Sequence, residues 1–156
     1  MRKILFLSLL LLSSVARAER AGTVGAGVII GDPFGPTLKY WTANQQAIDI
    51  GLGFDNDPVL YADYLWHNFQ LIPSAAGVKI APYIGVGPRF QFRRHDDDTF
   101  GFRVPLGVTF FLPQAPIELY AELVPVFQVS PNTDGNLDGG VGIRIYFAGP
   151  PGWKMP

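Results

Sequence analysis

A strict two-residue period runs through Ala47-Ile48-Asp49-Ile50-Gly51-Leu52-Gly53-Phe54. Every second side chain from Ile48 onward is apolar, and the positions between them hold aspartate or glycine. Such alternation is typical of a β-strand with one apolar and one polar face. Glycine weakens the interior of a strand and often marks a close approach of other groups. We therefore interpret the polar face as crowded rather than solvated.

The same alternation recurs along the chain. Eight strands are predicted, at about 22–30, 37–43, 47–54, 59–69, 80–92, 100–112, 117–129 and 139–147. Their polar faces carry ten glycines, namely Gly25, Gly27, Gly51, Gly53, Gly85, Gly87, Gly101, Gly107, Gly140 and Gly142. A narrow closed barrel accounts for this pattern if the polar face lines the interior and the apolar face meets lipid. The predicted fold class is thus all-β, an eight-stranded antiparallel up-and-down transmembrane barrel.

The N-terminus has the features of a secretory signal peptide. Arg2 and Lys3 precede an apolar run, and Ala16-Arg17-Ala18 provides a small-x-small cleavage site. The predicted organisation is a signal peptide at 1–18, a barrel at 19–147 and a short Pro/Gly-rich tail at 148–156.

The composition of the exported chain limits its function. Without Arg2, Lys3 and Arg17 it has 9 basic and 13 acidic residues, a formal charge of −4, which argues against a nucleic-acid partner. It has no cysteine, so disulfides do not stabilise it. Backbone hydrogen bonds of a closed barrel in lipid would supply that stability.

Alternation alone also fits a soluble lipocalin-like barrel that carries a ligand in the periplasm. The water-facing surface of such a barrel would hold many charged residues, whereas only 16% of this chain is charged. Aromatic residues gather near the segment ends, as in the interfacial girdles of membrane barrels. They are Tyr40, Trp41, Tyr64, Trp66, Phe69, Phe110, Phe111, Tyr146 and Phe147. The alternative is that some of them plug the ends of the barrel.

The inner face is predicted to hold a balanced network of four basic and four acidic side chains. Its members are Lys39, Arg89, Arg103, Arg144, Asp49, Asp63, Glu118 and Glu122. Such balance is needed in a dry interior, because unpaired buried charge is very costly. We expect a plugged lumen whose charges are structural, because eight strands leave room only for side chains. The alternative for the same residues is a path for protons or ions.

Prolines 82, 88, 105 and 125 fall inside predicted strands, so local bulges are expected there. If the first strand starts on the periplasmic side, the outward connections are roughly 31–36, 55–58, 93–99 and 130–138. They contain Asp32, Asp55, Asp57, Asp96, Asp97, Asp98, Asp134 and Asp138. The run Asp96, Asp97 and Asp98 is typical of a solvated loop tip. Together with Arg93, Arg94 and His95 it is also a candidate contact for a soluble partner.

Residues suited to catalysis are few. A lipid-hydrolysing barrel would need serine, histidine and an acid together. His67 is predicted near a strand end on the inner face, as a hydrogen-bonded residue of the lumen or its rim. The mature chain offers only Ser74 and Ser130, both in connections. The stretch from Asn132 to Asp138 resembles a calcium loop, but its glycine is at the fourth position and no glutamate completes it. We predict no enzyme, no cofactor and no metal site.

Several motifs together resemble a family of small, uncharacterised outer-membrane barrels that is likened to the eight-stranded transmembrane domain of OmpA. They are Ala62-Asp63-Tyr64-Leu65-Trp66-His67-Asn68-Phe69, Tyr83-Ile84-Gly85-Val86-Gly87, Val104-Pro105-Leu106-Gly107-Val108, Glu122-Leu123-Val124-Pro125-Val126 and Gly139-Gly140-Val141-Gly142-Ile143-Arg144. The resemblance covers about residues 22–147. It implies a fold and an outer-membrane location, and it transfers no catalytic residue. The last strand of an outer-membrane barrel usually ends the chain, whereas here a tail follows Phe147.

The sequence therefore predicts a monomeric outer-membrane barrel with a structural or adhesive role, exerted through short acidic loops. Its expected partners are outer-membrane lipid, the barrel assembly machinery and a soluble protein at the surface loops. A soluble ligand carrier and a lipid-modifying enzyme are the alternatives.

Overall fold

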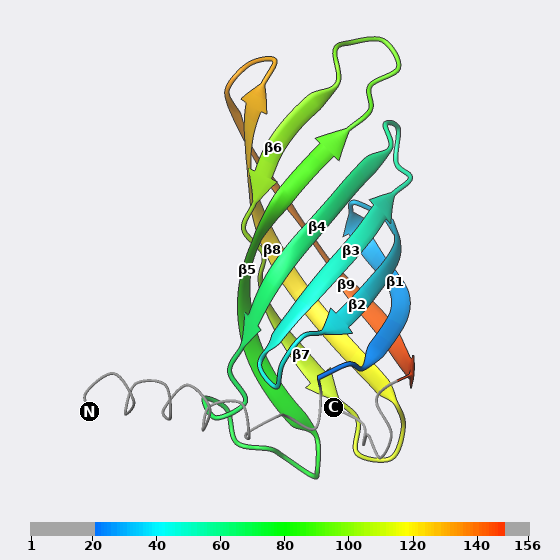
Figure 1. The fold of residues 1–156 in the computed structure, drawn as a ribbon, viewed down its shortest axis with the longest axis vertical. Coiled ribbons are helices and arrows are strands. Elements are labelled where there is room, and N and C mark those ends of the chain that lie inside the picture. The colour runs from blue at the N-terminus through cyan, green and yellow to red at the C-terminus, as the bar shows by residue number, and fades with distance from the viewer. Residues whose placement is uncertain (1–20, 149–156) are drawn as a thin grey trace, which may run out of the picture.

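The structure, a computed structural model, describes residues 21–148 as a single sheet wrapped into a barrel (Figure 1). The strands are β1 (Val24–Asp32), β2 (Gly35–Trp41), β3 (Gln46–Gly53), β4 (Val59–His67), β5 (Lys79–Gln91), β6 (Thr99–Arg103), β7 (Leu106–Phe111), β8 (Ile117–Ser130) and β9 (Asp134–Ala148). The predicted signal peptide lies outside the described residues, as does the predicted tail apart from Ala148.

The barrel closes without a free edge around most of its wall. All pairings are antiparallel, the sheet runs β4-β3-β2-β1-β9-β8-β6-β5, and β4 pairs with β5 to complete the circle. β6 and β7 are two parts of one strand interrupted at Val104 and Pro105, and both pair with β5 and β8. The predicted all-β, eight-stranded antiparallel barrel is confirmed.

The expectation of bulges at the prolines is wrong at all four positions. Pro82, Pro88 and Pro125 lie opposite Val108, Phe102 and Leu137 in regular register. Pro105 interrupts its strand instead of bulging it. The register shifts in fact fall between Val24 and Gly25 and between Phe100 and Gly101.

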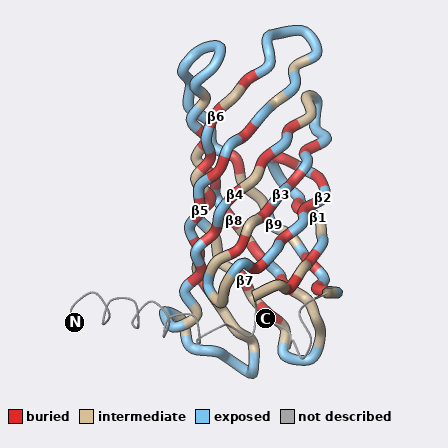
Figure 2. Tube along the Cα trace, viewed as in Figure 1, coloured by how far each residue is buried: buried red, intermediate tan, exposed pale blue. Residues whose placement is uncertain are grey.

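Burial alternates along the strands, as the red and pale blue bands of the tube show (Figure 2). The buried positions hold most of the charged residues of the strands and several tyrosines, with a few apolar residues such as Ile29 and Leu65. The exposed positions hold most of the leucine, isoleucine, valine and phenylalanine. A water-soluble ligand-carrying barrel has the reverse arrangement, with its apolar face inside. The orientation of the side chains therefore argues against the lipocalin-like alternative.

The two halves of the wall differ in length. β1 to β4 have between 7 and 9 residues each, whereas β5, β8 and β9 have 13, 14 and 15. As a result, the β5–β6 and β8–β9 hairpins project past the short β1–β2 connection (Figure 1). The predicted connection at 130–138 is wrong, because β9 begins at Asp134 and only residues 131–133 join it to β8. No helix long and apolar enough to cross a membrane occurs among residues 21–148.

Candidate functional site

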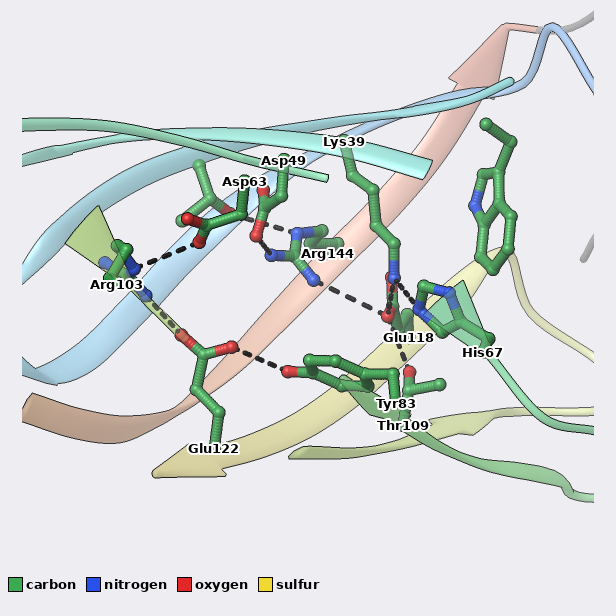
Figure 3. Close-up of polar contacts among 12 residues, drawn as sticks. Lys39, Asp49, Asp63, His67, Tyr83, Arg103, Thr109, Glu118, Glu122 and Arg144 are labelled. Atoms are coloured by element: carbon green, nitrogen blue, oxygen red, sulfur yellow. Dashed lines mark hydrogen bonds and ion pairs between the residues drawn. The ribbon is translucent and has the colours of Figure 1, made fainter. Parts of the chain in front are cut away.

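Most charged side chains of the interior belong to two groups of linked ion pairs (Figure 3). Glu118 of β8 is the centre of the first group. Its Oε1 lies 2.7 Å from Lys39 Nζ and 3.5 Å from Arg144 Nη1. Thr109 Oγ1 donates to the same oxygen at 2.5 Å, and the Tyr146 hydroxyl donates to Oε2 at 2.6 Å. One buried carboxylate thus holds together side chains from β2, β7 and β9.

Arg144 links Glu118 to the opposite wall. Its guanidinium pairs with Asp49 of β3 and donates through Nε to Thr37 Oγ1 at 3.1 Å. Its Cζ lies 3.8 Å from the ring centroid of Tyr120, within cation–π range. Arg144 therefore joins four different strands across the barrel axis.

Arg103 organises the second group. Its guanidinium lies 3.0 Å from Asp63 and 3.0 Å from Glu122, and its Cζ lies 3.8 Å from the ring centroid of Tyr61. The Tyr83 hydroxyl donates to Glu122 Oε2 at 2.7 Å. The two groups meet where Lys39 Nζ lies 5.6 Å from the ring centroid of Tyr83 (Figure 3). The structure thus buries all eight residues of the predicted charge network, each in an ion pair.

The partner of Arg89 is a residue that sequence reasoning placed in a loop. Arg89 Nε lies 3.1 Å from Asp138 Oδ2, and Asp138 is buried on β9. The described interior therefore has five acidic residues against four basic ones. The sequence does indicate that Asp138 faces inward. It lies at two-residue intervals from Gly140, Gly142 and Arg144, so all four fall on the same face of one strand.

Tyrosine rings occupy the space that the inner glycines leave. Tyr61 faces Gly51 on the next strand, Tyr83 faces Gly107, Tyr120 faces Gly142 and Tyr146 faces Gly25. A Cβ at any of these four glycines would overlap the facing ring. The sequence predicts crowding on this face but not these pairs. The charged side chains then pack on the rings, as Arg103 and Arg144 do.

An aromatic plug closes the end of the barrel where β2 and β7 terminate. We use this name for Trp41, His67, Phe69, Phe111 and Tyr146. Trp41 has no exposed surface, and its Nε1–H donates to the Tyr146 hydroxyl at 2.9 Å. For Trp41, Phe111 and Tyr146 the expected outer girdle is therefore wrong, and the alternative of residues that plug the barrel end is the one observed. Their side chains lie on the inner face of the barrel wall. Each follows another inward-facing residue by two positions, namely Lys39, Thr109 and Arg144.

Other residues of the predicted girdle do lie on the outer surface. The exposed ones are Tyr40, Tyr64, Trp66 and Phe147. The rings of Tyr64 and Trp66 contact each other edge to face, with centroids 4.9 Å apart. Amphipathic aromatic rings at this end fit the interface of a membrane.

His67 takes part in the plug and not in a serine site. Its Nε2 lies 3.0 Å from Lys39 Nζ, and its Nδ1 lies 3.3 Å from the Gln45 carbonyl oxygen. An ammonium can only donate, so Nε2 accepts and Nδ1 donates. Both ring nitrogens are thus occupied, while Ser74 and Ser130 are exposed. Among residues 21–148, no group of three or more side chains is arranged to hold a metal ion.

The predicted contact loop joins β5 to β6 at the end opposite the plug. Arg94, His95, Asp96, Asp97 and Asp98 are exposed, and Arg93 is half-buried. The loop is tied to its surroundings through its backbone. The Arg93 amide donates to Asp98 Oδ1 at 3.0 Å, and the Arg94 amide donates to Asp57 at 3.4 Å.

The same architecture occurs in a solved structure. The fold is that of a known bacterial barrel domain. The N-terminal β-barrel domain of Pseudomonas aeruginosa OprF superposes with a TM-score of 0.61 at 15% sequence identity, over 81% of this chain and 98% of that one. Neither a protein family nor a curated protein matches the sequence. The likeness to OprF and OmpA-type barrels thus stands at the level of the fold.

Proposed function

We propose that this protein is an outer-membrane barrel with a closed lumen that anchors an acidic outward rim for binding a soluble protein. The observation that carries the proposal is the sorting of its side chains. Apolar groups cover the outside of the wall, and paired charges fill the inside.

The outer surface supports the membrane location. Large apolar side chains are exposed on every strand, including Ile50, Leu119, Val141 and Ile143. Water would disfavour so large an apolar belt, and soluble monomers rarely expose contiguous patches of this extent. The likeness of the fold to the OprF barrel domain supports the same location.

The packing of the interior supports a closed lumen. Lys39, Arg103, Arg144 and Glu118 are fully buried across the middle of the barrel, and Trp41 closes one end. Each charge already has an ion-pair partner. A passing ion would have to displace these pairs, so we propose a structural role for the network and not a conduction path.

With the outside of the wall in lipid and the lumen closed, we assign the binding of a soluble protein to the outward rim. We assign it to the end opposite the aromatic plug, where Asp32, Asp55, Asp57 and the aspartates of the β5–β6 loop gather. An acidic rim would attract a partner with a basic surface and raise its rate of association. We propose no enzymatic role, because His67 is engaged by Lys39 and Gln45 inside the plug.

Fractionation and bilayer recording test the two parts of the proposal. We expect the protein to remain in the outer-membrane pellet after carbonate washing. Purified protein reconstituted in planar bilayers should produce no conductance steps. Fluorescence quenching of Trp66 by brominated lipid verifies that the silent preparation contains inserted protein. Release by carbonate would overturn the membrane location, and steady conductance by the parent protein would overturn the closed lumen.

A further inference from the structure

The unequal wall leaves one stretch of strand edge free. β1 ends at Asp32, which lies opposite Gly139 of β9. β9 continues past this point to Asp134 and pairs there with β8, up to Gln128 opposite Asp134. Among residues 21–148, no strand pairs with the other side of Asp134–Asp138. We call this stretch the free edge.

The ladder shows which groups of the free edge point outward. The Tyr146 amide donates to the Pro116 carbonyl on the β8 side at 2.8 Å, and the register between β8 and β9 continues without a shift to Asp134. Antiparallel residues bond to the same neighbour at every second position. Asp134, Asn136 and Asp138 therefore bond toward β8. Gly135 and Leu137 direct their N–H and C=O groups away from it.

One of these outward groups is already used, because the Gly135 amide donates to Asp134 Oδ1 at 2.8 Å. The Leu137 amide and the carbonyls of Gly135 and Leu137 remain available to an added strand. Edges of this kind are the usual template for β-strand addition, in which main-chain hydrogen bonds supply affinity and alternate side chains supply specificity.

The surroundings of the free edge differ on its two faces. On the inner face, Asp138 of the free edge is paired with Arg89. Next to the free edge, Asp32 lies opposite Gly139 and lines a polar hollow of about 470 Å³ together with Gly31, Asp55, Asn56, Asp57 and Gln91. Three carboxylates and no basic side chain line it. On the outer face, Leu137 is 63% exposed opposite Pro125 of β8, and the exposed Phe127 lies opposite the neighbouring Gly135. An added strand would meet acid on one face and apolar groups on the other.

We propose that the free edge receives an extended segment of a protein partner in which basic and apolar residues alternate. The basic side chains would face Asp32, Asp55 and Asp57, and the apolar ones would lie beside Leu137. This inference rests on the proposed function only in placing the rim outside the membrane. A second copy is a poor occupant, because antiparallel self-pairing about Asn136 sets Asp134 against Asp138.

A synthetic peptide tests this on the full-length protein in detergent micelles. The probe is an acetylated, fluorescein-labelled peptide of alternating lysine and valine, about nine residues long. We expect saturable binding by fluorescence anisotropy. The same peptide N-methylated at alternate amides keeps its charge but loses main-chain donors, and we expect it to bind about tenfold more weakly.

Variants locate the peptide on the protein. Leu137→Pro removes an outward donor but no bond to β8, and proline is tolerated on strand edges. We expect it to weaken binding about tenfold. Removal of two acidic charges beside the edge, as D55N/D57N, should also weaken binding. The matched control Q70K/Q114K changes the charge by the same amount at the plug end, outside the acidic rim, where both glutamines are exposed, and should leave binding unchanged.

Besides a complete absence of binding, three outcomes would overturn the inference. They are equal binding of the N-methylated peptide, unchanged affinity in both Leu137→Pro and D55N/D57N, and weaker binding in Q70K/Q114K alone. If Leu137→Pro does not fold, the N-methylated peptide on the parent protein still decides. Absence of any peptide binding would overturn the free-edge inference. That result would not affect the membrane location, which fractionation tests, or the closed lumen, which bilayer recording tests.

Discussion

The ring of Tyr120 on β8 lies over Gly142 on β9, where a Cβ would be 2.5 Å from the tyrosine hydroxyl oxygen. The guanidinium of Arg144 also packs on this ring, with Cζ 3.8 Å from its centroid. The glycine, the aromatic ring and the buried charge therefore depend on one another, and a change at any of the three should disturb the other two.

Gly142→Leu should prevent folding of the barrel, because the added side chain overlaps the Tyr120 ring. Refolding into detergent, followed by far-UV circular dichroism, measures this. Gly135→Ala is the matched control, since a Cβ there meets nothing within 4 Å, and it should fold like the parent. Tyr120→Ala should restore part of the folding of Gly142→Leu. Normal folding of Gly142→Leu with the parent Tyr120 would contradict the pairing.

Glu118→Gln should destabilise the barrel strongly. The change leaves Lys39 and Arg144 buried without the carboxylate that joins them, and breaking a buried pair in this way costs about 3–5 kcal/mol. Equilibrium unfolding in urea, from lipid vesicles, gives the free energy of unfolding. Asp97→Asn alters an exposed loop carboxylate and should change it little. Similar stability of both variants would show that the network does not hold the strands together.

Trp66 and Trp41 should respond in opposite ways to a quencher dissolved in lipid. Trp66 is 43% exposed on the outer wall, whereas Trp41 has 0% exposure inside the plug. In a Trp153→Phe background, the protein with only Trp66 should lose fluorescence in brominated-lipid vesicles. The protein with only Trp41 should keep it. Quenching of Trp41 instead would reverse the assignment of the two faces.

Val141→Lys should weaken insertion into lipid. Val141 is 56% exposed on the outer wall, and a lysine on the lipid-facing side of a barrel costs about 2–4 kcal/mol near the bilayer midplane. The folded yield in vesicles measures the loss. Detergent micelles, which adapt more easily, should tolerate the change better. A yield in vesicles equal to that of the parent would indicate that Val141 faces water.

Much of the interior could be predicted because strand periodicity assigns each side chain to a face. Lys39 and Asp49 follow directly from alternation within their segments. The same phase also placed Trp41 and Phe111 inside, but their position near strand ends favoured a girdle. Asp138 was hidden because Asn132-Thr133-Asp134-Gly135 reads as a turn.

The sequence does not predict which side chains of the inner face pair with one another. That Lys39 meets Glu118, 79 positions away, depends on how the strands are staggered around the barrel. The stagger is a property of the closed sheet and not of any one segment. For the same reason the tyrosines that cover Gly51, Gly107 and Gly142 could be predicted only as residues of the inner face.

The four tyrosine–glycine pairs have a consequence for assembly. They join β3 with β4, β5 with β7, β8 with β9 and, through Gly25 and Tyr146, the first strand with the last. A slip of two residues along any of these seams preserves the faces of the strands, yet it moves a ring away from the glycine that accommodates it. Each seam thus distinguishes its correct register locally. The seam between β1 and β9 joins the first strand to the last. Its own tyrosine–glycine pair selects the correct register there, independently of the other strands.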